Sequence, residues 1–249
     1  MFWISFWPSA GSVRAPGLNV SGLNNSSCGV LLCYVTDRRS LSAFEFAEQR
    51  KILLRKIEAA AMAGLDWIQI REKDLSGKDC AALTREALQR VEKFSASKTM
   101  PARILVNDRL DAALSENAGG VHLGDKSLPV AVARRLVDSR AGSSDFLIGV
   151  SCHSLESAKS AVAGGADYLF FGPVFATPSK TAFGEPQGLE RLAEVCGAVS
   201  IPVLAIGGVT LENSPACLAA GASGIAAIRL FQDAADLSLV VESLRKPNR

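Results

Sequence analysis

Hydrophobic positions change their period at regular intervals along the chain. From about residue 31 onward, short runs rich in β-branched and aromatic residues alternate with longer amphipathic segments, which is typical of βα units on a parallel sheet. The predicted strands are 31–37, 65–72, 102–108, 119–124, 146–151, 166–172, 201–208 and 222–229, with helices between them, for example over 41–63, 76–97 and 153–164. Eight such units predict an α/β fold, a single-domain (β/α)8 TIM barrel.

A doubly wound open sheet is the alternative architecture for such a pattern. Its first strand usually leads into a GxGxxG turn, and the corresponding stretch here, YVTDRRSL, has no glycine. The barrel is therefore favoured for residues 30–249. Residues 1–29 have a different composition, an aromatic run followed by Gly, Ser, Asn and Pro. For them we expect a poorly ordered N-terminal extension, or an effect of the chosen start codon.

Composition narrows the class of protein and of ligand. Of the 249 residues, 48% are hydrophobic and 21% charged, as in soluble globular proteins, and the net charge of +2 comes without a run of Lys or Arg. A nucleic-acid partner is therefore not expected, and no apolar stretch is long enough to span a membrane. The six cysteines lack CxxC spacing, so we expect reduced thiols in a cytoplasmic protein. Small-molecule substrates are expected, and a homo-oligomer is left open.

Polar residues and glycines follow the predicted strands at their carboxyl ends. In a barrel these ends meet at one mouth, where (β/α)8 enzymes carry their active sites. The segments IGGVT (206–210) and IAAIR (225–229) belong to the seventh and eighth strands, whose loops commonly bind a phosphate through backbone N–H groups. The alternative is a tight turn without a ligand. A phosphate site is favoured because both segments have the right place in the strand order.

Cations occur on one face of the second strand and its exit. In IQIREK, the residues Gln69, Arg71 and Lys73 share a face because side chains alternate along a strand. Two cations in one mouth suit a diphosphate, with Arg as a planar fork and Lys as a mobile point charge. The alternative is an ion pair with Glu72 or Asp74.

Asn107 and Asp108 end the third strand. A carboxylate beside a diphosphate is a usual way to hold Mg²⁺, and the alternative is that Asp108 caps the next helix. His122 in the fourth strand is interpreted as a hydrogen-bonded core residue rather than a base. His153 is expected at the start of a helix.

The segment ATPSK follows the sixth strand and supplies two hydroxyls and an ammonium group, from Thr177, Ser179 and Lys180. The loop that continues from it is long enough to fold over a ligand. The alternative is that Pro178 only makes a turn and Lys180 is solvated.

These motifs together resemble those of the thiamine phosphate synthase family, which includes the thiazole tautomerases. The matching segments are YVTD, IQIREKDLSGKD, LVNDRLDAAL, GGVHLG, IGVSCHS, GADYLFFGPVFATPSK, IPVLAIGGVTLEN and GASGIAAI, in family order over about residues 33–232. The resemblance implies a barrel that transfers the pyrimidine group of 4-amino-5-hydroxymethyl-2-methylpyrimidine diphosphate to a thiazole phosphate, with Mg²⁺. It also implies a pyrimidine carbocation, which requires stabilisation of the departing diphosphate more than a strong base.

The resemblance also assigns roles to residues of this sequence. It implies that Arg71, Lys73 and Lys180 act on the diphosphate as catalytic residues, and that Asp108 binds Mg²⁺. Substrate contacts are implied for Gln69, Asn107 and Ser151 on the pyrimidine side, for Thr177, Ser179 and Lys180 on diphosphate and thiazole, and for Gly208, Ile228 and Arg229 at the thiazole phosphate.

The stretch GVHLGDKSLP departs from the family pattern. Synthases usually have HLGQxD, whose Asp is a second metal ligand; here Asp125 stands at the Gln position and Ser127 at the Asp position. Asp125, from a shifted loop, is the candidate replacement. The tautomerases also lack that Asp, but their catalytic histidine corresponds to Pro173, and Arg229 stands where a synthase has a small residue. Three hypotheses stay open: a synthase with a rearranged metal site, a tautomerase-like isomerase, and a regulatory barrel that binds a thiamine-related phosphate without catalysis.

Overall fold

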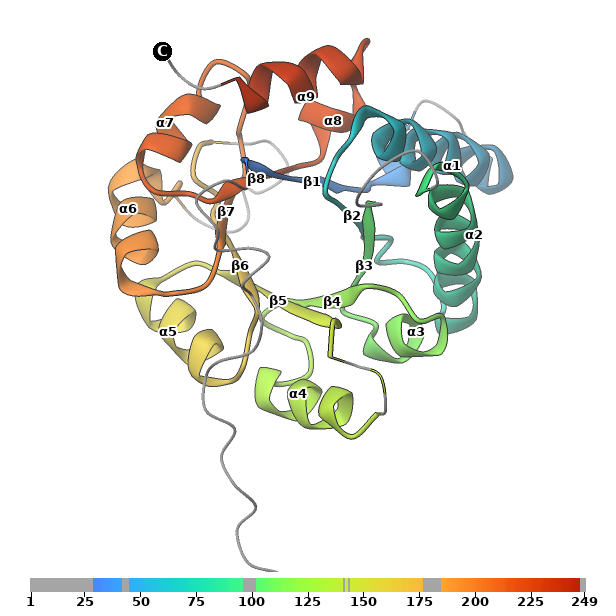
Figure 1. Ribbon diagram of the computed structural model, residues 1–249, viewed down its shortest axis with the longest axis horizontal. Helices are drawn as coiled ribbons and strands as arrows, with labels where there is room; N and C mark the ends of the chain where they lie inside the picture. Colours follow the sequence, from blue (N-terminus) through green and yellow to red (C-terminus); the bar gives the residue numbers. More distant parts are fainter. Residues whose placement is uncertain are drawn as a thin grey trace, which may run out of the picture.

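The computed structural model describes residues 29–41, 45–95, 102–140, 142, 144–176 and 185–246. Within them the chain forms a closed barrel of eight parallel strands in the order β1 to β8, surrounded by helices (Figure 1). The (β/α)8 prediction is confirmed. Residues 1–28 lie outside this part of the chain, so the N-terminal extension stays a prediction.

The strands lie where the hydrophobic pattern predicts them. They are β1 (Leu31–Val35), β2 (Trp67–Ile70), β3 (Arg103–Asn107), β4 (Gly120–Leu123), β5 (Leu147–Cys152), β6 (Tyr168–Phe171), β7 (Val203–Ile206) and β8 (Gly224–Ala227). Most are shorter than predicted, because polar residues and glycines at their ends belong to loops. β8 closes the barrel against β1, with Leu31 opposite Gly224.

The helices form the outer ring of Figure 1. They are α1 (Phe46–Ala63), α2 (Gly77–Ser95), α3 (Leu110–Ser115), α4 (Val130–Asp138), α5 (Leu155–Ala163), α6 (Gly188–Ala198), α7 (Ser214–Ala219), α8 (Arg229–Gln232) and α9 (Leu237–Arg245), and a 3-10 turn, η2 (Arg38–Ser40), follows β1. α1 ends at Gly64, whose φ of 91° suits glycine, and α5 begins after Ser154, whose side chain accepts the N–H of Ser157. Among the described residues, no helix has the length and apolar character needed to cross a membrane.

Side chains of the strands alternate between the barrel interior and the layer under the helices. The interior is packed by an apolar cluster of Leu31, Cys33, Val35, Trp67, Leu105, Tyr168, Phe170, Leu204 and Ala226. The ring centroids of Trp67 and Tyr168 lie 4.6 Å apart. Gly149 makes room for this packing, because a Cβ at that position would lie 1.9 Å from Cζ of Tyr168. The barrel is therefore a filled core, and its polar chemistry lies at its ends.

The described cysteines behave as core residues. Cys33, Cys80, Cys152 and Cys217 are buried, Cys196 is half-buried, and all five are free thiols. Burial raises the pKa of Cys152 to about 11. The four buried thiols are small residues of the core, and Cys28 lies outside the described residues.

Candidate active site

Three strands carry polar side chains from the interior face to the mouth. Gln69 of β2, Asn107 of β3 and Ser151 of β5 have the same parity as the apolar interior residues and lie near the carboxyl ends of their strands. Gln69 is 1% exposed, and its Nε2 donates to Oδ1 of Asn107 at 3.3 Å. The structure thus brings Gln69 and Asn107 together, while their role toward a substrate stays a prediction.

Arg71 and Lys73 lie just beyond the end of β2. Their neighbours in sequence are engaged elsewhere, because Glu72 Oε2 lies 3.0 Å and Asp74 Oδ2 2.6 Å from the guanidinium nitrogens of Arg38. Neither Arg71 nor Lys73 forms an ion pair with a described residue, so the salt-bridge alternative is wrong. Arg71 is the main cause that lowers the pKa of Lys73, and burial is the second. The two cations therefore act on each other at the mouth.

Asp108 follows β3 with a left-handed backbone, φ 67°, and an exposed side chain. It does not cap α3, whose N-cap is Arg109 without a side-chain cap hydrogen bond, so the capping alternative is wrong. No described residue donates a hydrogen bond to the Asp108 carboxylate. Its charge raises the pKa of Lys73, against the effect of Arg71. A carboxylate with no hydrogen bond from the described chain thus lies within electrostatic range of the cations.

Ser127 closes the turn after β4. Its Oγ accepts the N–H of Gly124 at 2.7 Å, and its own N–H donates to the carbonyl oxygen of Gly124 at 3.0 Å. The Asp125 side chain in this turn is 68% exposed, and its Oδ2 lies 3.8 Å from Nε2 of His153. Over the described ranges, no group of three or more His, Cys, Asp or Glu side chains is placed to hold a metal ion. Asp108 and Asp125 are therefore not part of such a larger cluster, and Asp125 has His153 as its neighbour.

His122 of β4 is a core residue, 2% exposed. Its Nδ1 lies 3.0 Å from the hydroxyl of Tyr168, and its Nε2 lies 2.9 Å from Oγ of Ser151. The interpretation as a hydrogen-bonded core histidine is confirmed, and the contact with Ser151 links it to the mouth. His153 lies just before α5, as predicted, and its Nδ1 is hydrogen-bonded to the carbonyl oxygen of Gly172.

Gly207 and Gly208 follow β7 with φ of 92° and 69°, values that favour glycine. A Cβ on Gly208 would lie 2.7 Å from the carbonyl oxygen of Ala176. Because β7 pairs with β8, this turn neighbours Ile228 at the exit of β8. No described residue accepts a hydrogen bond from the backbone N–H of Gly208 or Ile228. These donors fit the predicted phosphate site, which stays a prediction.

The remaining predicted residues divide into two groups. Thr177, Ser179 and Lys180 lie outside the described residues, so their closure over a ligand stays a prediction. Arg229 is the first residue of α8 and is exposed, directly after Ile228. Arg229 therefore begins its helix at the same exit of β8 as the predicted phosphate site.

Arg38 is a buried cation near the site that the sequence pattern does not single out. It is 4% exposed in η2, and it binds both Glu72 and Asp74. A signal for this contact exists in the alternation along IQIREKD. Glu72 and Asp74 have the opposite parity to the two cations of the motif, so they point away from the mouth, toward residues that leave β1 on its outer face.

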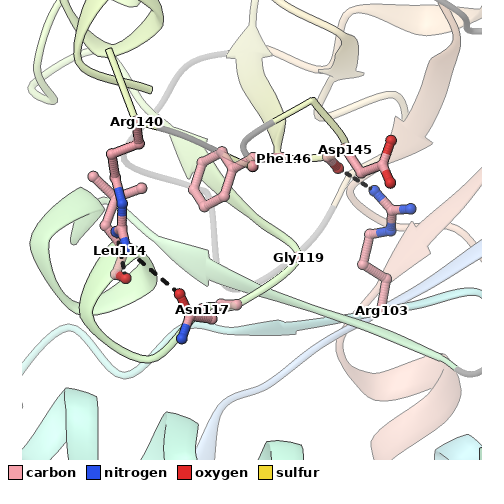
Figure 2. A pocket seen from close by; sticks show the side chains of 9 residues that line it. Arg103, Leu114, Asn117, Gly119, Arg140, Asp145 and Phe146 are labelled. Carbon is pink, nitrogen blue, oxygen red and sulfur yellow. Dashed lines mark hydrogen bonds between the residues drawn. The ribbon is translucent and has the colours of Figure 1, made fainter. Parts of the chain in front are cut away.

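A cavity of about 340 Å³, shown in Figure 2, opens near the starts of β3, β4 and β5. These strand starts lie at the end of the barrel opposite to the mouth. It is lined by Arg103, Leu114, Asn117, Ala118, Gly119, Arg140, Gly142, Asp145 and Phe146. Arg103 donates to the carbonyl oxygen of Asp145 and Arg140 to that of Leu114, each at 2.6 Å. None of the predicted site residues that the structure describes lines this cavity. It is therefore separate from the candidate active site.

Comparison with known proteins identifies the family of the chain. The family model described as thiamine monophosphate synthase matches residues 32–231. A putative thiamine-phosphate synthase of Geobacter sulfurreducens is 46% identical over 71% of this chain and 78% of its own, and the thiamine-phosphate synthase of Chloroflexus aurantiacus is 40% identical over 76% and 82%. The structure of thiamine phosphate pyrophosphorylase from Pyrococcus furiosus superposes with a TM-score of 0.70 at 32% identity, covering 87% of this chain and 94% of its own. The chain therefore belongs to the thiamine monophosphate synthase family.

Proposed function

We propose that this protein is a Mg²⁺-dependent thiamine phosphate synthase, a transferase of the pyrimidine group. The observation that carries the proposal is the pair formed by Arg71 and Lys73 at the mouth, with which no described residue forms an ion pair. Two neighbouring cations without an ion-pair partner among the described residues fit the diphosphate of the pyrimidine substrate. The free thiols of the described cysteines support a cytoplasmic location.

Arg71 and Lys73 are proposed to assist the cleavage of the bond to the diphosphate. The C–O bond between the pyrimidine methylene and the diphosphate breaks, and both electrons leave with the oxygen. The methylene carbon becomes a carbocation, and the lone pair of the thiazole nitrogen then forms the new C–N bond. Negative charge develops on the departing diphosphate, where Arg71 offers a planar fork and Lys73 a point charge. Charges already in place lower the barrier because they need no reorganisation during the reaction. Lys180 is proposed to act on the same group.

The polar side chains of the interior face are proposed to hold the pyrimidine. The contact between Gln69 and Asn107 restrains both amides, and His122 restrains the hydroxyl of Ser151. Side chains that are already ordered lose little entropy when a ligand binds. The site is therefore prepared for a flat, polar ring before the substrate arrives.

The opposite side of the mouth is proposed to bind the thiazole phosphate. The backbone N–H groups of Gly208 and Ile228 would face its oxygens, and Arg229 follows at the same strand exit. Thr177 and Ser179 are proposed to close on diphosphate and thiazole. This arrangement places the two phosphorylated substrates on different strand exits of one barrel.

A magnesium ion is proposed to bind beside the diphosphate. Mg²⁺ is usually held by one or two carboxylates together with substrate phosphate oxygens and water, so a site with few carboxylates at the mouth fits it. Asp108 and Asp125 are the proposed ligands. Ser127 has a neutral hydroxyl, whose oxygen accepts the N–H of Gly124. When bound, the ion neutralises negative charge on the diphosphate.

An isomerase of the tautomerase type has less support. The position of the tautomerases' catalytic histidine is Pro173 here, which has no group that exchanges protons and is buried. His122, the core histidine of β4, is fully engaged with Tyr168 and Ser151.

The test is thiamine phosphate formation by the purified protein from both substrates, first with Mg²⁺ and then with a chelator. We expect product with Mg²⁺ and its loss with the chelator. Product formation that continues in the presence of the chelator contradicts the metal requirement. No product from protein shown to be folded contradicts the synthase, and thermal stabilisation by the substrates would then indicate a binding role, because a ligand of the folded state raises apparent stability.

Variants of the purified protein separate the proposed roles. Asp108→Asn and Lys180→Ala should reduce turnover far more than Ser127→Ala, because the first two remove charges proposed to face the diphosphate or its metal. Comparable losses in all three variants contradict the assignment.

A further inference from the structure

Behind the two cations of the mouth lies a buried polar cluster of Thr36, Arg38 and Glu72, here called the anchor cluster. The exposed fractions of these residues are 0%, 4% and 8%. Glu72 has the opposite parity to Arg71 and Lys73, so its side chain lies on the outer side of the barrel wall. Charged residues are rarely buried unless they are paired, so the contacts of this cluster require a reason.

The carboxylate of Glu72 is fully occupied by its neighbours. Its Oε1 accepts the hydroxyl of Thr36 at 2.6 Å, and its Oε2 accepts Nη1 of Arg38 at 3.0 Å and the Arg38 backbone N–H at 3.1 Å. The guanidinium also binds Asp74 at 2.7 and 2.6 Å. Burial raises the pKa of Glu72, and the hydrogen bonds from Thr36 and Arg38 oppose this effect. Because a buried ion pair adds little net stability, its value here lies in the geometry that it fixes.

Thr36 connects the anchor cluster to the mouth. Its Oγ1 accepts the backbone N–H of Arg71 at 3.0 Å while its hydroxyl proton goes to Glu72. Glu72 stands between Arg71 and Lys73 in the sequence. The contacts of Thr36 with Arg71 and Glu72 therefore restrain the backbone segment that carries both cations. The exits of β1 and β2 are thereby locked to each other.

Arg71 and Lys73 carry like charges and repel each other, so a free loop would let them separate. We propose that Arg38 and Glu72 are positioning residues, which act with Thr36 to hold the two cations together for a diphosphate group. The inference rests on the proposed function, in which this diphosphate belongs to the pyrimidine substrate. It adds that the affinity for diphosphate depends on side chains that do not touch it.

The sharpest test compares two replacements of Thr36. Thr36→Val keeps the shape and removes the hydroxyl that joins Glu72 to Arg71, whereas Thr36→Ser keeps the hydroxyl and removes a methyl group. Calorimetry with inorganic diphosphate and Mg²⁺ should show binding about fivefold weaker in Thr36→Val, the effect of one lost hydrogen bond, and near wild type in Thr36→Ser. A merely structural role would instead make affinity follow thermal stability in both variants.

Glu72→Gln provides a second measurement, because it keeps the size of the side chain and removes its charge. Its KM for the pyrimidine diphosphate should rise while its KM for the thiazole phosphate stays unchanged. The matched control is Arg134→Lys, which perturbs an ion pair of 2.5 Å with Asp167 at the other end of the barrel. The control should lose thermal stability and bind diphosphate like the wild type.

The outcomes separate the inference from the proposed function. Diphosphate affinity unchanged in both Thr36→Val and Glu72→Gln overturns the inference, even if the wild type forms thiamine phosphate. A wild type that binds diphosphate but forms no product overturns the proposed function alone, and weaker binding in Thr36→Val then still supports the anchor cluster. If Glu72→Gln does not fold, the two Thr36 variants decide.

Discussion

Asp66 and Asp167 make the same contact on opposite sides of the barrel. Each residue directly precedes a strand, β2 or β6, and accepts a backbone N–H from the start of the preceding strand. Oδ2 of Asp66 accepts the N–H of Leu32 at 2.8 Å, and Oδ2 of Asp167 accepts that of Ile148 at 2.7 Å. In a closed barrel of eight strands these positions lie across from each other (Figure 1). Each carboxylate therefore joins two strands at the end opposite to the mouth.

Removing either carboxylate should destabilise the barrel. An arginine completes each contact, Arg245 at 2.9 Å from Asp66 and Arg134 at 2.5 Å from Asp167. Asp66→Ala and Asp167→Ala should each lower the free energy of unfolding by about 1–3 kcal/mol, because a backbone N–H and a guanidinium lose their acceptor. Because the two sites share no partner, the double variant should lose the sum. Urea unfolding of the three variants measures these losses.

The control for this series is Glu242→Ala. Glu242 and Lys246 form an exposed ion pair of 3.1 Å, and such pairs contribute about 0–1 kcal/mol. A double variant that loses no more than either single variant would show that the two contacts are not independent.

Part of this arrangement is predictable from the sequence. The segments AGLDW and GGADY predict helix ends that turn into strands, and Gly64 and Gly165 have φ of 91° and 92° there. The partners of the two aspartates are not predictable in this way. They lie 34 and 19 residues earlier in the chain, and the period within one segment contains no information on the register between two strands.

Gly149 and Tyr168 supply a second prediction, on packing. Gly149→Ala should lower the free energy of unfolding by about 1–3 kcal/mol, because the new Cβ would lie 1.9 Å from Cζ of the Tyr168 ring, which is fully enclosed. Displacement of that ring should also disturb the hydrogen bond between Tyr168 and His122. Thermal and urea unfolding measure the effect.

Gly197→Ala is the matched control. Gly197 lies in α6, and nothing lies within 4 Å of the place where its Cβ would be. The substitution should raise the free energy of unfolding by roughly 0.5–1 kcal/mol, because alanine loses less conformational entropy in a helix. Equal destabilisation by both substitutions would show that the contact with Tyr168 is not the cause.

In the candidate site, the sequence pattern predicts side-chain positions only within the strands. Alternation along β2 indicates the face on which Gln69 lies, because the period of two continues to the end of the strand. It indicates the outward direction of Glu72 and Asp74 but not their partner Arg38, which lies in a 3-10 turn after β1. It also does not predict the contact of Asp125 with His153, which joins two loops. Loops have no period, so their side-chain contacts depend on tertiary structure.

Lys73 supplies a prediction on pH. Arg71→Gln should raise the pKa of Lys73, because the neighbouring cation is the main cause that lowers it, and Asp108→Asn should lower it further, because that carboxylate raises it. NMR titration of isotopically methylated lysines, assigned with Lys73→Arg, measures the pKa in each variant. Shifts of the same sign in the two variants would contradict the arrangement of charges at the mouth.

The lowered pKa of Lys73 affects both the stability of the protein and the binding of diphosphate. Between the lowered pKa of Lys73 in the folded protein and its higher value in the unfolded chain, the folded state binds fewer protons. The contribution of Lys73 to the free energy of unfolding therefore rises with pH across this window. Diphosphate binding should change in the opposite direction, because a neutral Lys73 no longer attracts the anion. Calorimetry with inorganic diphosphate at increasing pH measures that loss.

Ser127→Asp tests the metal side of the proposed function. It restores a carboxylate where the family pattern has one, and an aspartate oxygen can still accept the N–H of Gly124 that Ser127 accepts now. Because the number of ligand charges sets the affinity of such cation sites, the variant should need less Mg²⁺ for half-maximal turnover. Ser127→Ala is the control, and it should leave the Mg²⁺ requirement unchanged because the hydroxyl only closes the turn. An unchanged requirement in Ser127→Asp would mean that this turn does not face the metal, and Asp125 would then lose its place as a ligand as well.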